Sequence, residues 1–231
     1  MKQFDQNEFN RFILENEVIG FFDTPITLKS GRQSNWYVNW RTITEDVFLT
    51  EKLSDFLISF IVANELRPDC IYGVPEGATK LGIISQCEWA KSFTNYNIGS
   101  HVLAMGRGKP KDHGDPKDRY FLGMPKGKIA IVEDVTTTGG SLLFSIDQIA
   151  ESGGEVIVAI SLTDRMERRD DGTSVRQAVE EKGIRYAPMS SALQLLPAAS
   201  EKYNIGAELR RFVEEEFEKY GTEPISLRRT K

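Results

Sequence analysis

Apolar runs in the middle of the chain alternate with segments whose apolar residues recur at helical spacing. A strand buried on both faces of a parallel sheet reads as a continuous apolar run, whereas a helix buries one stripe. The runs predict strands at 70–74, 101–105, 129–133, 156–162 and 184–187. Helical spacing predicts helices at 79–92, 141–152 and 174–182. This alternation indicates parallel β-α-β units with helices on both faces of the sheet.

The ends of the chain carry further patterns. Residues 9–13 indicate a short amphipathic helix, and a strand is expected around 36–39. The apolar stripe over 49–61 predicts a long helix that ends before Pro68. A charged helical pattern follows residue 206. We therefore expect one domain over 1–231, divided into an N-terminal helix and hood (1–45), an α/β core (46–190) and a C-terminal helical extension (191–231).

Composition adds few constraints. The 231 residues are 40% hydrophobic and 27% charged, which is ordinary for a globular protein. The net charge of −5 argues against a general nucleic-acid surface. No apolar run is long enough to span a membrane and no apolar signal region begins the chain, so we expect a cytoplasmic protein. Cys70 and Cys87 lack metal-site spacing and are expected to be reduced thiols.

The segment 128–141 combines an apolar run, two adjacent acids and a Thr/Gly/Ser turn. Glu133 and Asp134 can accept hydrogen bonds from sugar hydroxyls. The turn opens an apolar helix, whose N-terminal N–H groups and partial positive charge suit a phosphate. One short segment could therefore hold a ribose and its 5′-phosphate.

Other readings of this segment fit less well. The chain has no G-x-x-x-x-G-K-[ST] motif, and Gly139-Gly140 does not complete G-x-G-x-x-G. An ordinary strand-to-helix turn with a Thr/Ser cap remains the structural alternative. However, two acids that end a buried strand are costly without a partner.

The region 106–126 is rich in Gly, Pro, Lys and Asp, and a loop this long is usually functional or disordered. A mobile basic loop can close over a pyrophosphate, neutralise its charge and exclude water. A solvated surface loop is the alternative for a charge cluster alone. Four potential cations lie in it: Arg107, Lys109, Lys111 and His113.

The turn at 133–141 resembles the phosphoribosyl-diphosphate (PRPP) loop of type I phosphoribosyltransferases. Two further segments, 27–32 and 163–168, match the same family. Together with this turn and the basic loop 107–114, they occur in the order found in orotate phosphoribosyltransferases. The resemblance spans roughly residues 1–190. It implies the type I phosphoribosyltransferase fold, an α/β fold with a central, mostly parallel sheet flanked by helices and a small N-terminal hood. It also implies Mg²⁺-dependent conversion of orotate and PRPP to orotidine 5′-monophosphate and pyrophosphate, in pyrimidine biosynthesis.

The resemblance assigns roles to residues. Glu133 and Asp134 would bind the ribose hydroxyls, and Lys29 would reach the orotate and pyrophosphate region. The 5′-phosphate would be cradled by Thr136, Thr137, Thr138, Gly139, Gly140 and Ser141.

Three residues are assigned to the base by the same resemblance. Arg165 would bind the orotate carboxylate or its surroundings. Trp36 and Tyr37 would lie beside the orotate ring, although they could equally be core and edge aromatics. The neighbouring Arg168 and Arg169 are expected to be solvated loop charges.

The basic loop of the family reaches into the neighbouring subunit's active site, which implies a homodimer with shared sites. Arg107, Lys111 and His113 would stabilise the departing pyrophosphate together with Mg²⁺. The metal would be held mainly through PRPP oxygens and water. The catalytic group is thus expected to comprise Lys29, Arg107, Lys111, His113 and Asp134.

Two positions depart from the family pattern. Many bacterial members have lysine after the loop arginine, where this chain has Gly108; Lys109 can substitute with a different side-chain direction. The turn 73–80 lacks a lysine at the matching place, although Gly77 and Ala78 could present N–H groups to pyrophosphate.

Two alternative functions are open. A transferase for another base is one alternative. A PRPP-sensing regulator without turnover is the other, and the intact Lys111–His113 loop disfavours it.

Overall fold

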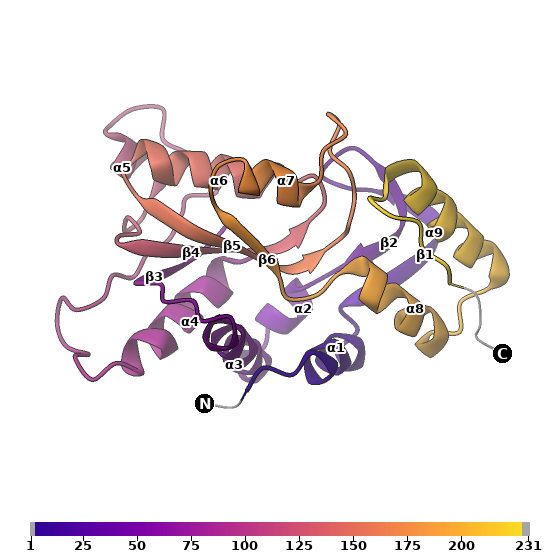
Figure 1. Cartoon of the computed structure of the whole chain (residues 1–231), viewed down its shortest axis with the longest axis horizontal. Helices are drawn as coiled ribbons and strands as arrows, with labels where there is room; N and C mark the ends of the chain where they lie inside the picture. Colours follow the sequence, from indigo (N-terminus) through magenta and orange to yellow (C-terminus); the bar gives the residue numbers. More distant parts are fainter. Residues whose placement is uncertain (1–2, 228–231) are drawn as a thin grey trace.

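The computed structural model describes residues 3–227, within which a four-stranded parallel sheet forms the centre (Figure 1). The remaining six residues of the predicted domain lie outside the described part. A separate antiparallel pair, β1 (Ile19–Thr27) and β2 (Gln33–Val38), forms the hood. The predicted α/β class with a parallel central sheet is confirmed. Its strands lie side by side in the order β3 (Cys70–Gly73), β4 (Lys128–Thr136), β5 (Glu155–Asp164) and β6 (Arg185–Pro188).

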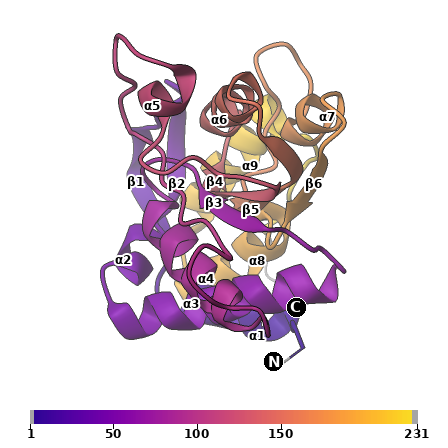
Figure 2. The ribbon, with the colours of Figure 1, turned by 90° about the vertical axis from the view of Figure 1, so that its left-hand side faces the viewer.

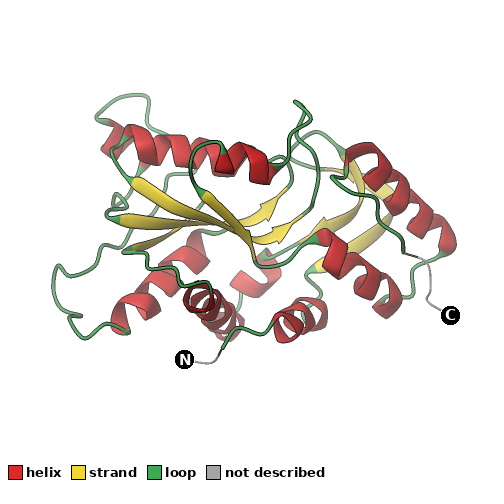
Figure 3. Ribbon diagram, in the orientation of Figure 1, coloured by secondary structure: helices red, strands yellow, loops and turns green. Residues whose placement is uncertain are grey.

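Helices cover both faces of the central sheet (Figures 2 and 3). One face carries α6 (Gly140–Glu151) and α7 (Val175–Glu180). The opposite face carries α3 (Val47–Ala63) and α4 (Thr79–Lys91). The other helices of the described chain are α1 (Gln6–Glu15), α2 (Arg41–Thr44), α5 (Pro116–Tyr120), α8 (Ala192–Lys202) and α9 (Ala207–Tyr220).

The side chains of β4 alternate between these two layers. Ile129 and Ile131 pack in the cluster that contains residues of α6, whereas Ala130 and Val132 pack in the cluster that contains residues of α3. All four are fully buried. Burial on both faces explains why the strand reads as a continuous apolar run instead of an alternating one.

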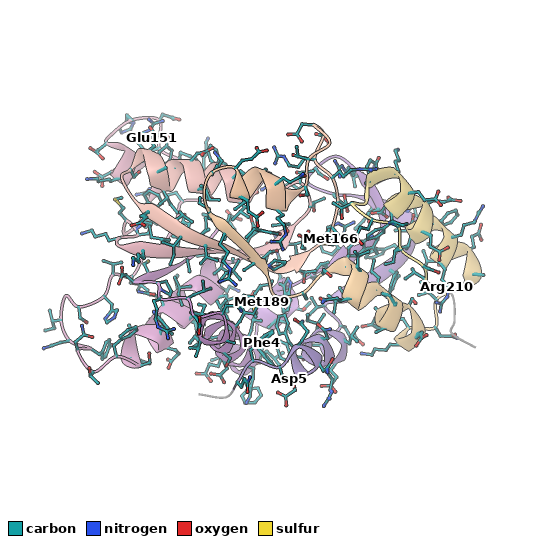
Figure 4. The ribbon with its side chains drawn as sticks, in the orientation of Figure 1. Phe4, Asp5, Glu151, Met166, Met189 and Arg210 are labelled. Carbon is teal, nitrogen blue, oxygen red and sulfur yellow. The ribbon has the colours of Figure 1, made fainter. Side chains whose placement is uncertain are left out.

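Aromatic contacts tie the N-terminal helix to the α3 side of the core. Phe4, labelled in Figure 4, meets Phe60 edge-on, with ring centroids 5.1 Å apart. Phe9 stacks on Trp40 at 5.9 Å. The N-cap residue Asp5 accepts a hydrogen bond from the backbone N–H of Glu8 at 2.8 Å, which fixes where α1 begins.

The predicted strand at 101–105 is wrong. The amide of Gln86 separates this segment from β3, because it accepts from the Ile71 N–H at 2.8 Å and donates to the Val102 carbonyl at 2.8 Å. The segment pairs instead with residues farther along its own loop, through Met105 N–H to Gly123 at 3.2 Å and an isolated bridge from Gly106 to Phe121. These bonds close the base of the basic loop.

The chain leaves neighbouring strands towards opposite faces. After β3 it enters α4 on one face, and after β4 it enters α6 on the other (Figure 2). Such a divergence opens a crevice at the carboxyl ends of parallel strands, where ligands of open α/β sheets bind. No helix of the described residues is long and apolar enough to cross a membrane.

Candidate active site

A cleft of about 740 Å³ opens where β3 and β4 end. It lies between the turn after each strand and two parts of the hood, the β1–β2 turn and the end of β2. Most of the predicted site residues contribute to its wall. These are Lys29, Tyr37, Gly77, Glu133, Asp134, Thr137, Thr138, Gly139, Gly140, Ser141 and Arg165.

The turn between β4 and α6 has the geometry of an anion-binding site. Gly139 is the N-cap residue, with φ +69°, and a Cβ there would lie 2.9 Å from the Val175 side chain, so glycine is required. No side chain caps α6. Its first N–H groups therefore keep their hydrogen-bonding capacity for a ligand, with the helix dipole favouring a negative one.

Two cations from outside the turn support it. Lys29, in the turn after β1, donates from Nζ to Ser141 Oγ at 2.9 Å, which joins the hood to the phosphate turn. Arg169 donates from Nη1 to the Thr138 carbonyl at 2.7 Å. The expectation that Arg169 is merely solvated is therefore wrong, because its guanidinium is bonded to the backbone of the turn.

Glu133 and Asp134 stand directly before this turn. The Asp134 carboxylate accepts from the Val135 N–H at 2.9 Å and lies against Gly77, where a Cβ would be 2.2 Å from Oδ2. Only glycine at position 77 lets the β3 turn approach the acid this closely. Burial raises the pKa of Glu133 well above its ordinary value, and the Asp134 charge adds to the rise while Lys29 opposes it.

Two predicted cleft residues lie elsewhere. Trp36 is fully buried, stacks on Phe217 at 6.1 Å and is not among the residues lining the cleft. Thr136 is also fully buried, with its Oγ1 2.7 Å from the Tyr186 hydroxyl. The expected placement of Trp36 beside a bound ring and of Thr136 in a phosphate cradle is therefore wrong. Successive side chains of a strand face opposite ways, so Trp36 and Tyr37 cannot both face the cleft.

The basic loop keeps its cations outside the cleft of its own chain. Lys109, Lys111 and His113 are exposed, and Arg107 donates from Nε to the Asp118 carbonyl at 3.2 Å. Of the predicted loop, only Gly108 lines the cleft.

The two departures from the family pattern meet in space. A Cβ at Gly108 would lie 2.5 Å from Glu76 Oε1, so the acid in the β3 turn occupies the space beside the glycine in the loop. Glu76 also lines the cleft. A lysine at 108 would require Glu76 to move.

Arg165 lines the cleft but is only 1% exposed. Its Nε donates to Glu167 at 2.6 Å and its Nη2 donates to Glu216 at 2.9 Å. The guanidinium carbon lies 3.6 Å from the centroid of the Trp36 ring. The predicted base-binding arginine is therefore paired with two carboxylates.

Sequence reasoning missed several residues of the cleft wall. Glu76 could have been suspected, because the sequence showed that its turn lacks the lysine expected there. Asn39, Arg41 and Phe144 carried no such signal: Asn39 directly follows β2, Arg41 and Phe144 lie in helices, and none of them belongs to a recognisable motif.

The buried acid makes a prediction about stability. Since the folded-state pKa of Glu133 lies above its ordinary value of 4.5, folded protein retains a proton that unfolded protein releases. Stability is therefore lost as pH rises from the unfolded pKa through the folded one. Without substrates, Glu133→Gln should raise Tm at pH 8 by about 3 °C or more, with the gain shrinking towards pH 4.5.

Thermal unfolding across this pH range checks the prediction. The exposed Glu155→Gln is the control, because it removes the same charge without burial. A Tm difference for Glu133→Gln that stays constant with pH would contradict the raised pKa.

Similarity to known proteins agrees with this geometry, although no protein-family model matches the chain. The orotate phosphoribosyltransferase of Rhodopseudomonas palustris is 32% identical over 178 residues, which cover 74% of this chain and 87% of the relative. The crystal structure of orotate phosphoribosyltransferase from Francisella tularensis has a TM-score of 0.66 at 21% identity, covering 93% of this chain and 100% of that one. The Mycobacterium tuberculosis orotate phosphoribosyltransferase in complex with PRPP has a TM-score of 0.55 at 19% identity, covering 82% and 98%. The chain belongs to the orotate phosphoribosyltransferase family, and its fold is the type I phosphoribosyltransferase fold.

Proposed function

We propose that this protein transfers the phosphoribosyl group of PRPP to orotate, giving orotidine 5′-monophosphate and pyrophosphate in pyrimidine biosynthesis. The proposal rests on the residues that line one cleft. The acid pair, the uncapped turn at the start of α6, Tyr37 and Arg165 all line it. The cleft would thus hold a ribose phosphate and a base side by side. Membership of the family supports orotate as the base.

The ribose phosphate would be held by β4 and the turn that follows. Glu133 and Asp134 would accept hydrogen bonds from the 2′- and 3′-hydroxyls. Backbone N–H groups and hydroxyls of residues 137–141 would bind the 5′-phosphate. The Ala78 N–H donates to the Val74 carbonyl at 3.2 Å, so of the two expected pyrophosphate donors in this turn we retain Gly77.

The base subsite would consist of Tyr37 and Arg165. Tyr37 is 37% exposed and lines the cleft, which suits contact with a planar ring. Orotate can react through a ring-nitrogen anion, so no protein nucleophile is required. Lys29 would lie between base and phosphates, with its Nζ already at Ser141.

Mg²⁺ fits the residues at this site when the substrate supplies most of its ligands. The described residues contain no group of three or more His, Cys, Asp or Glu side chains that could hold a metal ion. Glu133 and Asp134 offer carboxylate oxygens next to the proposed sugar hydroxyls, and Mg²⁺ commonly binds one or two carboxylates together with phosphates and water. When bound, Mg²⁺ would neutralise charge on the pyrophosphate.

The leaving group also needs cations from the protein. Cleavage of the C1′–O bond leaves positive character on the ribose and negative charge on pyrophosphate. Glu76 adds a negative charge to the wall, and the loop cations lie outside their own cleft. We infer that Arg107, Lys111 and His113 act in the site of a second subunit, in a homodimer, with Lys109 assisting.

A substrate panel tests the proposed function. Purified protein with PRPP and Mg²⁺ should consume orotate and release pyrophosphate, with far slower reaction of uracil or purines. Pyrophosphate release with another base but not orotate would identify a transferase for that base. PRPP binding without turnover of any base would identify a regulator, and either outcome would contradict the proposal.

Subunit mixing tests the shared site. Lys111→Ala and Asp134→Ala should each be nearly inactive as homodimers, because each removes one half of every site. After exchange of equal amounts, mixed dimers keep one intact site, so activity should return to about a quarter of wild type. No recovery after verified exchange would show that each chain uses its own loop.

Three predictions from the sequence stay predictions: the domain organisation, the location, and the absence of nucleic-acid and membrane partners. The single domain over 1–231 with divisions near 45 and 190 is supported by a core cluster that includes Phe9, Leu57 and Val213. The cytoplasmic location, and the absence of nucleic-acid and membrane partners, remain predictions.

A further inference from the structure

The C-terminal helix α9 places an acidic side chain against the arginine of the proposed base subsite. Glu216 is 9% exposed, and its Oε1 accepts from Arg165 Nη2 at 2.9 Å and from Ser34 Oγ at 2.8 Å. Its Oε2 accepts from the Asn35 N–H at 3.2 Å. The carboxylate is therefore held by the guanidinium and by two groups of β2.

The position of α9 is itself fixed by packing. Phe217 stacks on Trp36, and Trp36 lies under the Arg165 guanidinium. Arg210, labelled on α9 in Figure 4, donates from Nη2 to the Ser200 carbonyl at 2.9 Å and from Nη1 to the Leu227 carbonyl. Glu216 is thus presented by a helix anchored to both β2 and α8.

The hydrogen bonds of Arg165 leave little for a ligand. Its Nε donates to Glu167 and its Nη2 to Ser34 and Glu216. Its Nη1 donates to the Trp36 carbonyl at 3.3 Å. Each guanidinium nitrogen is therefore already bonded within the protein, and a carboxylate entering the cleft competes with Glu216 and Glu167.

The charges of this network are balanced. Arg32 donates to Glu167 at 2.9 Å, so the buried Arg165 and the half-buried Arg32 face two buried glutamates. Asp170, which also pairs with Arg32, is 92% exposed and is screened by water. A carboxylate that approaches Arg165 consequently meets no net positive charge from this network.

We propose that Glu216 is a specificity-determining residue that acts through Arg165. It neutralises the guanidinium and so reduces the preference of the base subsite for a carboxylated base over an uncharged one. Glu167 is two residues from Arg165 and also pairs with Arg32. Glu216 comes from the C-terminal extension and can be altered without touching that second pair. The proposal rests on the proposed function, since it assumes that the base lies beside Arg165.

The test compares Glu216→Gln with Glu218→Gln. Glu218 is exposed on the same helix, so the control removes an equal charge away from the network. The KM of orotate and the inhibition constant of uracil, which lacks the carboxylate, are measured at saturating PRPP. Glu216→Gln should lower the KM of orotate at least about fivefold with little change in kcat, because the freed guanidinium attracts the substrate anion. Uracil inhibition, and both constants of the control, should stay within about twofold of wild type.

A purely structural role for Glu216 predicts a different result. In that case Glu216→Gln would weaken orotate and uracil together, or change neither, and either outcome would overturn the proposal. Thermal unfolding confirms that the variant is folded. If it is not, Glu216→Asp serves instead, because the shorter side chain retracts from Arg165 and should shift the constants in the same direction by less.

Calorimetric titration of orotate and uracil separates this inference from the proposed function. Wild-type protein that binds orotate but does not convert it would contradict the proposed function alone, and the Glu216→Gln affinity would still test the inference. Active wild-type protein whose orotate affinity is unaltered by Glu216→Gln would contradict the inference alone. Wild-type protein that neither binds nor converts orotate would contradict both.

Discussion

Burial of the Glu133 carboxylate in β4, next to the half-buried Asp134, is the constraint on which the site depends. Glu133 is 6% exposed, and its charged form is disfavoured by burial and by the neighbouring Asp134. Without function this arrangement would only cost stability. Nearby features fit around it: Gly77 leaves room for the Asp134 carboxylate, and Lys29 brings a positive charge from the hood. The acids, the Thr/Gly turn after β4 and the first residues of α6 then line the cleft together, along a single stretch of backbone.

At the proposed base subsite the buried charge has the opposite sign. There the buried charge is a cation, Arg165, and two glutamates compensate it. An unpaired guanidinium in this position would be costly, because burying a charge without a partner is strongly unfavourable. Compensation lowers that cost and also lowers the attraction for a substrate anion. A carboxylate partner of Arg165 therefore stabilises the site without ligand but lowers its affinity for a substrate carboxylate. Glu216 is the partner that the C-terminal extension contributes.

Much of the fold was readable from the sequence, because its strands are continuous apolar runs and its helices are marked by apolar stripes. The phosphate turn was readable for a related reason: its acids, glycines and strand are consecutive. The absence of a strand at 101–105 was not readable, because it depends on one side chain: Gln86 of α4 takes the hydrogen bonds that a strand pairing would have used. The pattern of hydrophobic residues does not reveal that a polar side chain of a helix lies between two segments of the chain.

The errors within the site have similar causes. Trp36 and Tyr37 are adjacent, and the pleat of β2 sends one to the core and the other to the cleft. The sequence alone did not determine which. Arg165 was correctly placed at the cleft, yet its partner Glu216 lies 51 residues away on a helix with several other glutamates. Arg169 was missed because its contact is with a backbone carbonyl, which leaves no mark in the sequence.

The central claim is that the end of β4 and the turn after it hold a ribose 5′-phosphate. A crystal structure of the protein with orotidine 5′-monophosphate tests this most directly. We expect the phosphate within hydrogen-bonding distance of backbone N–H groups of residues 137–141, and the ribose hydroxyls on Glu133 and Asp134. A nucleotide whose phosphate lies away from this turn, or whose ribose does not touch either acid, would contradict it.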